Sequence, residues 1–131
     1  MHKIVITYND RKKLLDMLEH KHRLSSYEEA LLDELQRAEL ALSEEIPDDV
    51  ITMNSQIRFT DVDTGEKMTY WLSFPDEADL SSDRISVLSP VGCELLGYRK
   101  GDEIEVGAPS GLKILRIEEI LHQPEAAGNF A

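Results

Sequence analysis

The stretch "ISVLSPVGCELLGYRKGDEIEV" (residues 85–106) changes its pattern several times within a short length. It begins as an apolar run typical of a strand, and Pro90 ends that strand because proline has no amide hydrogen for a ladder. "VGCELLG" then predicts a short helix, for which Gly97 suits the C-terminal cap. Gly101 and Asp102 mark a turn before the strand "EIEV". The stretch therefore predicts a strand, a helix and a second strand that meet at one corner of a small sheet.

Alternating strands surround this corner on both sides. In "QIRFTDV" the apolar Ile57 and Phe59 alternate with polar residues, and "DTGE" is a turn signal in which Gly65 can take a positive φ. "KMTYWLSF" resumes the alternation and completes a β-hairpin pattern. "LKILRIEEIL" predicts a final strand after the turn "APSG", and "HQPEAAGNFA" is a tail with few core-forming residues. The apolar face of the second strand consists of Met68, Tyr70, Leu72 and Phe74.

Two short helices are predicted before the strands. "KIVITY" (residues 3–8) predicts a brief strand or arm, and Asn9 or Asp10 provides an N-cap for the helix that follows. A capping box, Ser25 with Glu28 or Ser26 with Glu29, begins the second helix. That helix should continue to "SEEIPDD", where proline ends it. Its apolar seam has heptad-like spacing and consists of Leu24, Leu31, Leu35, Ala38 and Leu42.

These elements predict an α+β protein in two parts. Residues 1–46 form an N-terminal arm and a short antiparallel helical hairpin, and residues 47–131 form a domain with a mostly antiparallel sheet, one short helix and the tail. Such a shape suggests a binding protein with a protruding arm. A hairpin that pairs internally needs no second chain, so we expect a monomer.

Composition limits the function classes. The formal net charge of -12 disfavours autonomous binding to phosphate backbones, so we expect no direct contact with nucleic acid. Cys93 is the single cysteine, which fits a reducing cytoplasm and a small, partly buried thiol. There is no apolar run of roughly 20 residues, the length needed to span a bilayer, and no signal-peptide pattern. The sequence therefore predicts a cytoplasmic protein without a membrane segment.

No motif for catalysis or for a cofactor stands out. "HKH" (residues 20–22) places two histidines near each other, but no cysteine or third histidine accompanies them. The acidic pairs at 28–29, 44–45 and 48–49 could bind Mg²⁺ with a partner's ligands, but are more typical of caps and a solvated face. "GYRKGD" lacks the Gly-Lys-Ser/Thr of a phosphate loop. Four aromatic residues could line a pocket or form the sheet core, and the strand spacing favours the core: Phe59, Tyr70, Trp71 and Phe74.

The corner resembles the C-terminal domains of the bacterial Gre transcript-cleavage factors. Those domains share the pattern Ile-Ser-x-x-Ser-Pro, a short helix with Leu and Gly, then Gly-Asp and Pro-x-Gly, and the match covers about the last 80 residues. The matching positions here are Ile85, Ser86, Ser89, Pro90, Leu95, Leu96, Gly97, Gly101, Asp102, Pro109 and Gly111.

A fuller resemblance is to the Rnk family, named as regulators of nucleoside diphosphate kinase. "IPDDVITMNS" (residues 46–55) and "QPEAAG" (residues 123–128) are similar to signatures of that family that Gre factors lack. The resemblance implies a short N-terminal coiled coil and an FKBP-like C-terminal domain. It also implies binding to bacterial RNA polymerase at the secondary channel, in competition with Gre factors.

The resemblance assigns roles to particular residues. It implies that the loop at the Ser-Pro motif docks on the polymerase, which places the contacts at Ser86, Leu88, Ser89 and Pro90. Gre factors tend to have a polar or acidic residue at the position of Leu88. The hairpin end of Gre factors offers carboxylates to the catalytic Mg²⁺, and the matching residues here are Glu19, His22, Arg23, Glu28 and Glu29.

Helix length favours binding without transcript cleavage. A helix of about 18 residues spans roughly 27 Å, whereas the coiled coil of Gre factors looks about twice as long. A catalytic carboxylate must come within about 2.0–2.1 Å of Mg²⁺. We therefore expect a non-enzymatic regulator that needs no cofactor.

Three alternatives stay open: an active cleavage factor that uses carboxylates of the hairpin end, an FKBP-like prolyl isomerase, and a protein that contacts nucleoside diphosphate kinase directly.

Overall fold

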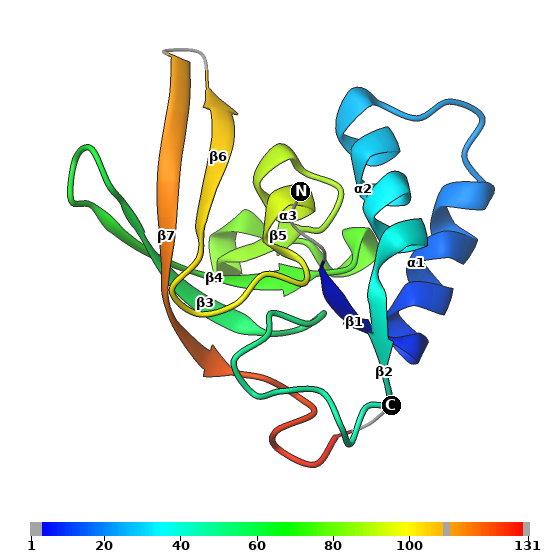
Figure 1. Cartoon of the computed structure of the whole chain (residues 1–131). Helices are drawn as coiled ribbons and strands as arrows, with labels where there is room; N and C mark the ends of the chain where they lie inside the picture. Colours follow the sequence, from blue (N-terminus) through cyan, green and yellow to red (C-terminus); the bar gives the residue numbers. More distant parts are fainter. Residues whose placement is uncertain (1–3, 109–110, 130–131) are drawn as a thin grey trace.

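Five strands form the main sheet in the computed structural model, which describes residues 4–108 and 111–129 (Figure 1). Their order across the sheet is β5-β4-β3-β7-β6. The β4–β5 pair is parallel and the other three pairs are antiparallel, which confirms a mostly antiparallel sheet in an α+β protein. The strands are β3 (Gln56–Asp61), β4 (Lys67–Ser73), β5 (Arg84–Ser86), β6 (Glu103–Ala108) and β7 (Gly111–His122).

The β-hairpin predicted from alternation is confirmed as β3 and β4. Phe59 pairs with Met68 in this ladder, and Gly65 has a φ of +77 in the connecting turn. Tyr70 and Leu72 lie on the face that packs on the core. Trp71 lies on the other face, because successive strand residues point to opposite sides; the expectation that it belongs to the sheet core is therefore wrong.

The corner at residues 84–106 has the predicted order of strand, helix and strand, but the first strand ends before Pro90 because Ser86 and Ser89 form a hydrogen-bonded turn there. β5 ends at Ser86, α3 (Pro90–Leu95) follows one turn later, and β6 begins at Glu103. Gly97 has a φ of +81 just after the helix, a conformation that glycine adopts without steric cost. Two short 3-10 helices, Pro75–Glu77 and Leu80–Ser82, connect β4 to β5. The turn predicted at "APSG" includes residues 109–110, which lie outside the described residues.

The N-terminal part is a helical hairpin closed at its base by two strands. β1 (Val5–Thr7) precedes α1 (Tyr8–Glu19), and β2 (Glu39–Ala41) follows α2 (Ser26–Arg37). β1 and β2 pair in parallel, with Ile6 opposite Leu40. Figure 1 shows α1 and α2 beside the sheet, with α2 next to α3.

Two boundary predictions for these helices are wrong. Thr7, rather than Asn9 or Asp10, caps α1, and its side chain accepts a hydrogen bond from the Asp10 amide. α2 ends at Arg37 rather than near "SEEIPDD" because the next residues pair with β1. Leu42 is therefore outside the helical seam and 47% exposed. Each helix has 12 residues, so it spans about 18 Å rather than 27 Å.

The hairpin and the sheet share one hydrophobic cluster. Leu14, Leu18, Leu31 and Leu35 of the helices are buried together with residues of the sheet such as Leu72. Arg11 also donates a hydrogen bond to the Leu35 carbonyl at 2.9 Å, which links α1 to α2. The helices therefore lie against the rest of the molecule instead of protruding from it. The division into domains at residue 46 stays a prediction.

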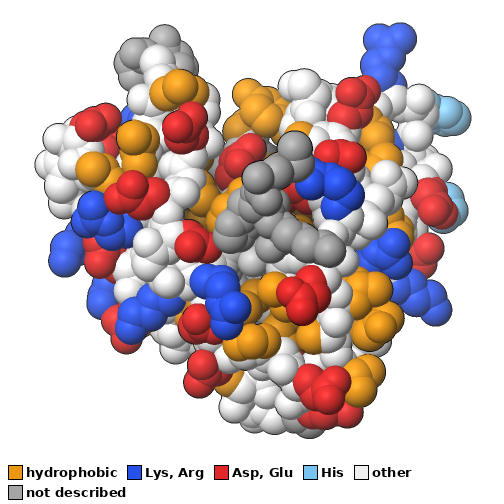
Figure 2. All heavy atoms as spheres, viewed as in Figure 1, with side chains coloured by type: hydrophobic (Ala, Val, Ile, Leu, Met, Phe, Trp, Pro, Cys, Tyr) orange, Lys and Arg blue, Asp and Glu red, His pale blue; other side chains and the backbone are white. Residues whose placement is uncertain are grey.

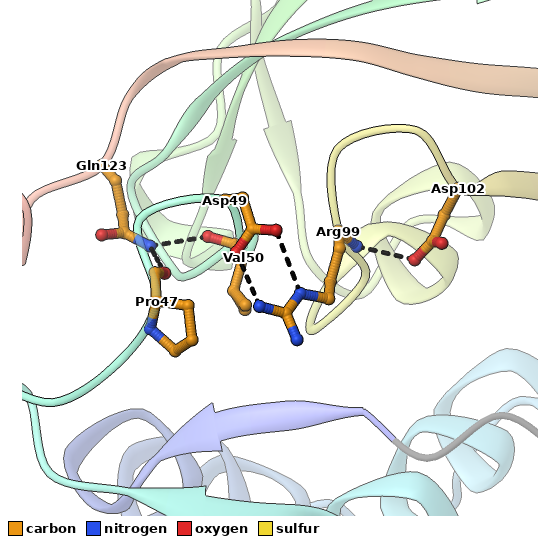
Figure 3. Close-up of polar contacts among 6 residues, drawn as sticks. All are labelled: Pro47, Asp49, Val50, Arg99, Asp102 and Gln123. Atoms are coloured by element: carbon orange, nitrogen blue, oxygen red, sulfur yellow. Dashed lines mark hydrogen bonds and ion pairs between the residues drawn. The ribbon is translucent and has the colours of Figure 1, made fainter.

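The C-terminal tail is part of the fold, contrary to its polar composition. Gln123 is 4% exposed, and its side-chain amide donates hydrogen bonds to the carbonyls of Pro47 and Val50 at 2.8 and 2.7 Å (Figure 3). The Thr52 hydroxyl donates to Glu125 at 2.7 Å. The tail and the segment 46–55 thus hold each other in place, because buried polar groups need hydrogen-bond partners.

Candidate functional site

The Ser-Pro turn, which we define as residues 86–92, is held by hydrogen bonds within itself. The Ser89 hydroxyl donates to the Ser86 carbonyl at 2.6 Å and accepts from the Gly92 amide at 3.1 Å, which caps α3. The Ser86 hydroxyl accepts from the Leu88 amide at 3.0 Å. Both serine hydroxyls therefore have local partners, and their first role is to fix the backbone of the turn.

Gly92 and Val87 make this turn rigid. A Cβ atom on Gly92 would lie 2.0 Å from the Ser86 carbonyl oxygen, so any larger residue would force the backbone apart. Val87 is fully buried, and its amide donates to the Ser73 carbonyl at 2.9 Å. The turn is thus anchored to β4 and offers the same shape to any partner.

The Ser-Pro turn exposes Pro90 beside an apolar cavity. Leu88 is half-buried against the core, whereas Pro90 is exposed. The cavity has a volume of about 390 Å³ and opens between α3 and the sheet. Leu80 contributes to its edge and is 76% exposed, so an apolar side chain lies at the mouth of an apolar cavity. The other lining residues are Phe59, Met68, Tyr70, Ile85, Ser89, Pro90, Val91, Val106, Gly107, Lys113 and Leu115.

The second candidate region is the hairpin end, which we define as residues 19–29. Glu28 is buried, and its carboxylate accepts a hydrogen bond from the Ser25 amide at 2.8 Å. The same carboxylate lies 2.6 Å from Lys21 Nζ. The Lys21 ammonium and the Ser25 amide hold the pKa of Glu28 below its usual range. The structure thus selects the Ser25–Glu28 capping box and leaves Glu28 without a free face for a metal ion.

The other predicted residues of the hairpin end are exposed. Glu19 is the last residue of α1, His22 and Arg23 lie in the connection, and Glu29 lies in the first turn of α2. Acidic, basic and histidine side chains gather at this edge in Figure 2. The end therefore presents mixed charge rather than a converging set of carboxylates.

The remaining acidic pairs and the histidines form no metal site within the described ranges. No group of three or more His, Cys, Asp or Glu side chains there is placed to hold an ion. Asp49 instead accepts two hydrogen bonds from the Arg99 guanidinium, at 3.2 and 2.8 Å (Figure 3). Arg99 keeps the pKa of Asp49 below its usual range. This pair joins the segment before β3 to the loop after α3.

Three titratable groups lie together between α2 and α3, and no sequence motif indicated this cluster. Burial and nearby carboxylates raise the pKa of the Cys93 thiol to about 12, so it is not a nucleophile at neutral pH. Burial, with the neighbouring Glu94, raises the pKa of Glu34 to about 7, and burial also raises the pKa of Glu94. These acids come from different elements, so no local motif could have paired them.

Among the α-helices of the described residues, none combines the length and the hydrophobicity needed to cross a bilayer.

Comparison with known proteins places the chain in a family. Residues 46–122 match the model described as the C-terminal region of the transcription elongation factors GreA and GreB. An Escherichia coli K12 protein named "Regulator of nucleoside diphosphate kinase" is 42% identical over 103 residues, which are 78% of this chain and 76% of that protein. Transcription elongation factor GreA of Syntrophotalea carbinolica is 40% identical over 70% of this chain and 58% of its own length.

Solved structures agree with this placement. A transcription elongation factor GreA/GreB from Nitrosomonas europaea is 39% identical, has a TM-score of 0.81, and covers 93% of this chain and 100% of its own. A GreA factor homolog of Thermus thermophilus, 23% identical with a TM-score of 0.52, shares the fold. The family match spans more than half of the chain and includes the whole Ser-Pro turn. This chain therefore belongs to the GreA/GreB C-terminal family.

Proposed function

We propose that this chain is a non-enzymatic transcription regulator that binds bacterial RNA polymerase near the secondary channel and competes there with Gre factors. The family match over residues 46–122, which contains the Ser-Pro turn, is the observation that carries this proposal. The relative named "Regulator of nucleoside diphosphate kinase" supports a regulatory role. The proposal includes a cytoplasmic monomer with an FKBP-like domain and a short coiled coil.

The Ser-Pro turn is the proposed docking element. Pro90 is exposed at its apex, and the apolar cavity beside it can accept an aliphatic side chain of the partner. Ser86 and Ser89 act by fixing the turn, since their hydroxyls already have local partners. Leu88 contributes mainly by packing, because it is half-buried against the core. A rigid, partly apolar surface of this kind loses little conformational entropy on binding.

Occupation of the channel without transcript cleavage is the proposed effect. The helices of 12 residues span about 18 Å each, which shortens the reach of the hairpin further than the sequence implied. Glu28 is committed to Lys21 and Ser25, whereas the exposed carboxylates of Glu19 and Glu29 come from different helices. A metal-bound active site needs its carboxylate at about 2.0–2.1 Å from Mg²⁺, and this end offers neither the reach nor the paired groups.

A pull-down with core RNA polymerase tests the docking assignment. The variants Leu80→Asp and Ser89→Asp with Pro90→Ala change the cavity edge and the turn, and aspartate keeps an N-cap for α3. We expect each to weaken binding by about tenfold or more, as loss of a central contact does. Leu121→Asp is the matched control, since Leu121 is 42% exposed near the far end of β7. If both variants bind core polymerase as well as the wild-type chain does, the docking assignment is wrong.

An assay of RNA release from backtracked transcription complexes distinguishes a non-enzymatic regulator from a cleavage factor. We expect no RNA fragments above the intrinsic rate of the polymerase, and we expect this chain to slow cleavage that a Gre factor stimulates. Fragment release that disappears in Glu28→Ala with Glu29→Ala would instead establish the cleavage alternative.

The prolyl-isomerase alternative would need an apolar pocket with aromatic side chains, and the apolar cavity has Phe59 and Tyr70 in its lining. A protease-coupled isomerisation assay on Xaa-Pro peptides tests this alternative. Strong catalysis that Tyr70→Ala abolishes would favour the isomerase over the regulator.

A further inference from the structure

A second cavity, polar in character, lies at a different place from the Ser-Pro turn. It has a volume of about 370 Å³ and is formed where α1, the end of β7 and the tail meet β4 and β5. Small-molecule sites commonly have volumes of about 300–1,000 Å³. The lining residues are Asp10, Lys13, Met53, Asn54, Trp71, Arg84, His122, Pro124, Glu125 and Asn129.

The sole tryptophan of the chain lies in this cavity. Trp71 is partly exposed, and its ring centroid lies 5.6 Å from that of His122, with an angle of 56° between the planes. The Arg84 guanidinium lies 5.3 Å from the Trp71 ring centroid. The Trp71 indole is thus a partly exposed ring on which one flat heteroaromatic ring can stack, and the tilted His122 imidazole lies beside it.

The cations of the polar cavity form no close ion pairs with carboxylates of the described residues. Across residues 4–108 and 111–129, neither Lys13 nor Arg84 forms an ion pair within 4.0 Å, whereas Arg58, Arg99 and Arg116 each do. Lys13 Nζ instead lies 5.9 Å from the Phe74 ring centroid. Lys13 and Arg84 act on the carboxylates of Asp10 and Asp79 only at longer range. Both cations can therefore donate to an anionic ligand, for which arginine and lysine are the usual donors.

The acids of the same cavity are already engaged. Asp10 Oδ2 accepts a hydrogen bond from the Met53 amide at 3.1 Å, and Asp10 is only 5% exposed. Glu125 accepts the Thr52 hydroxyl at 2.7 Å. Burial raises the pKa of Asp10 to about 6, which reduces its negative charge just below neutral pH. The groups of the cavity that remain for a ligand are therefore mostly its hydrogen-bond donors and its aromatic rings.

We propose that this cavity binds a mononucleotide. Its base stacks on Trp71 with His122 beside it, and its phosphates contact Lys13 and Arg84. The volume suits one nucleotide rather than a polynucleotide, and the acidic surface of the whole chain disfavours a long phosphate backbone. Asp10 and Glu125 lie where ribose hydroxyls can donate to their remaining lone pairs. This site is separate from the proposed docking turn, and its occupancy does not depend on polymerase.

Tryptophan fluorescence tests the proposal directly, because Trp71 is the only tryptophan. Titration of the full chain with ADP should quench the emission saturably, and isothermal calorimetry should give the same affinity. Lys13→Gln and Arg84→Gln should each weaken ADP binding by about tenfold, as loss of a charge-assisted hydrogen bond does. Lys12→Gln is the matched control, since Lys12 is exposed on the same helix outside the cavity.

Two smaller probes assign the parts of the site. Adenosine should bind more weakly than ADP because it lacks phosphates, and inorganic pyrophosphate should bind more weakly because it lacks a ring. No saturable heat or quenching at millimolar ADP would overturn the proposal. So would equal weakening by the Lys12 and Lys13 variants, equal affinity for pyrophosphate and ADP, or equal affinity for adenosine and ADP. Circular dichroism of each variant checks that it is folded.

Discussion

The Ser-Pro turn and the hairpin end are both built around a serine that caps a helix, yet they differ in what they leave exposed. In the turn, the Ser89 hydroxyl bonds twice within seven residues, and Gly92 fits where no Cβ atom can. At the hairpin end, the Ser25–Glu28 box is completed by the Lys21 ion pair, and charged side chains surround it. One region is fixed by backbone geometry and the other by side chains.

The difference bears on which region can be a specific contact. A turn fixed by a glycine and internal hydrogen bonds keeps its shape when its exposed side chains change, so Pro90 can be fitted to a partner, as can the neighbouring Leu80 at the cavity edge. Exposed charges on short helices hold little fixed geometry, and individual surface pairs contribute little energy. We therefore expect substitutions in the turn to have large effects and those at the hairpin end to have small ones.

The strongest way to break the turn is Gly92→Ala. The added Cβ atom would lie 2.0 Å from the Ser86 carbonyl oxygen, so we expect a loss of about 3 kcal/mol or more in the free energy of unfolding. Gly107→Ala is the control, since nothing lies within 4 Å of its Cβ position; we expect its effect to stay below about 1 kcal/mol. Urea denaturation measures both, and equal stability of the two variants would contradict the account of the turn.

The packing of α2 against α3, behind the two regions, should depend on pH through Glu34. Burial and Glu94 raise the pKa of Glu34 from 4.5 to about 7, so the folded state binds a proton more tightly than the unfolded state. The contribution of Glu34 protonation to the stability of the folded state is fully present below pH 4.5 and is lost as the pH rises through 7. Glu34→Gln should therefore stabilise the chain at pH 8 relative to wild type, by about 1–2 kcal/mol after allowance for its half-exposed position.

Urea denaturation between pH 5 and pH 8 measures this effect. The stability difference between Glu34→Gln and wild type should grow with pH, whereas Glu29→Gln, exposed on the same helix, should show no such trend. A difference that is constant across this range would rule out Glu34 as the titrating group.

Loss of the capping box at the hairpin end should lower the stability of the chain by a smaller amount. Ser25→Ala removes the hydroxyl that accepts from the Glu28 amide at 3.1 Å, and we expect a loss of about 1 kcal/mol in the free energy of unfolding. Ser26→Ala, one position inside α2, should cost less than half as much. Thermal unfolding of the two variants compares them, and a larger loss for Ser26→Ala would show that the other box forms in solution.

The smallest effect should come from the ion pair at the hairpin end. Lys21 is 39% exposed as a side chain, although Glu28 is nearly buried, so Lys21→Gln should lower stability by only about 0.5 kcal/mol. The loss should shrink in high salt, which screens exposed charges. A loss as large as that of Gly92→Ala would remove the distinction between the two regions.

Local sequence signals determined the secondary structure to a large extent. The β3–β4 hairpin followed from alternation and a glycine turn, and the strand-helix-strand corner followed from Pro90 and Gly97. The Ser25–Glu28 box was also recognisable, as one of two possible boxes. These signals work because periodicity, proline and capping hydrogen bonds act between residues that are close in the sequence.

Tertiary structure decided what those signals left open. α2 stops at Arg37 because β2 pairs with β1, from the other side of the hairpin. Asp10 does not cap its own helix but accepts a hydrogen bond from the Met53 amide, 43 positions away. The buried Gln123 donates a hydrogen bond to the Val50 carbonyl, 73 positions away. The polar cavity likewise joins Lys13, Trp71 and His122 from three distant segments. Such partners depend on which surfaces the chain brings together on folding, and a polar residue in the sequence does not reveal whether a distant group will satisfy its hydrogen bonds.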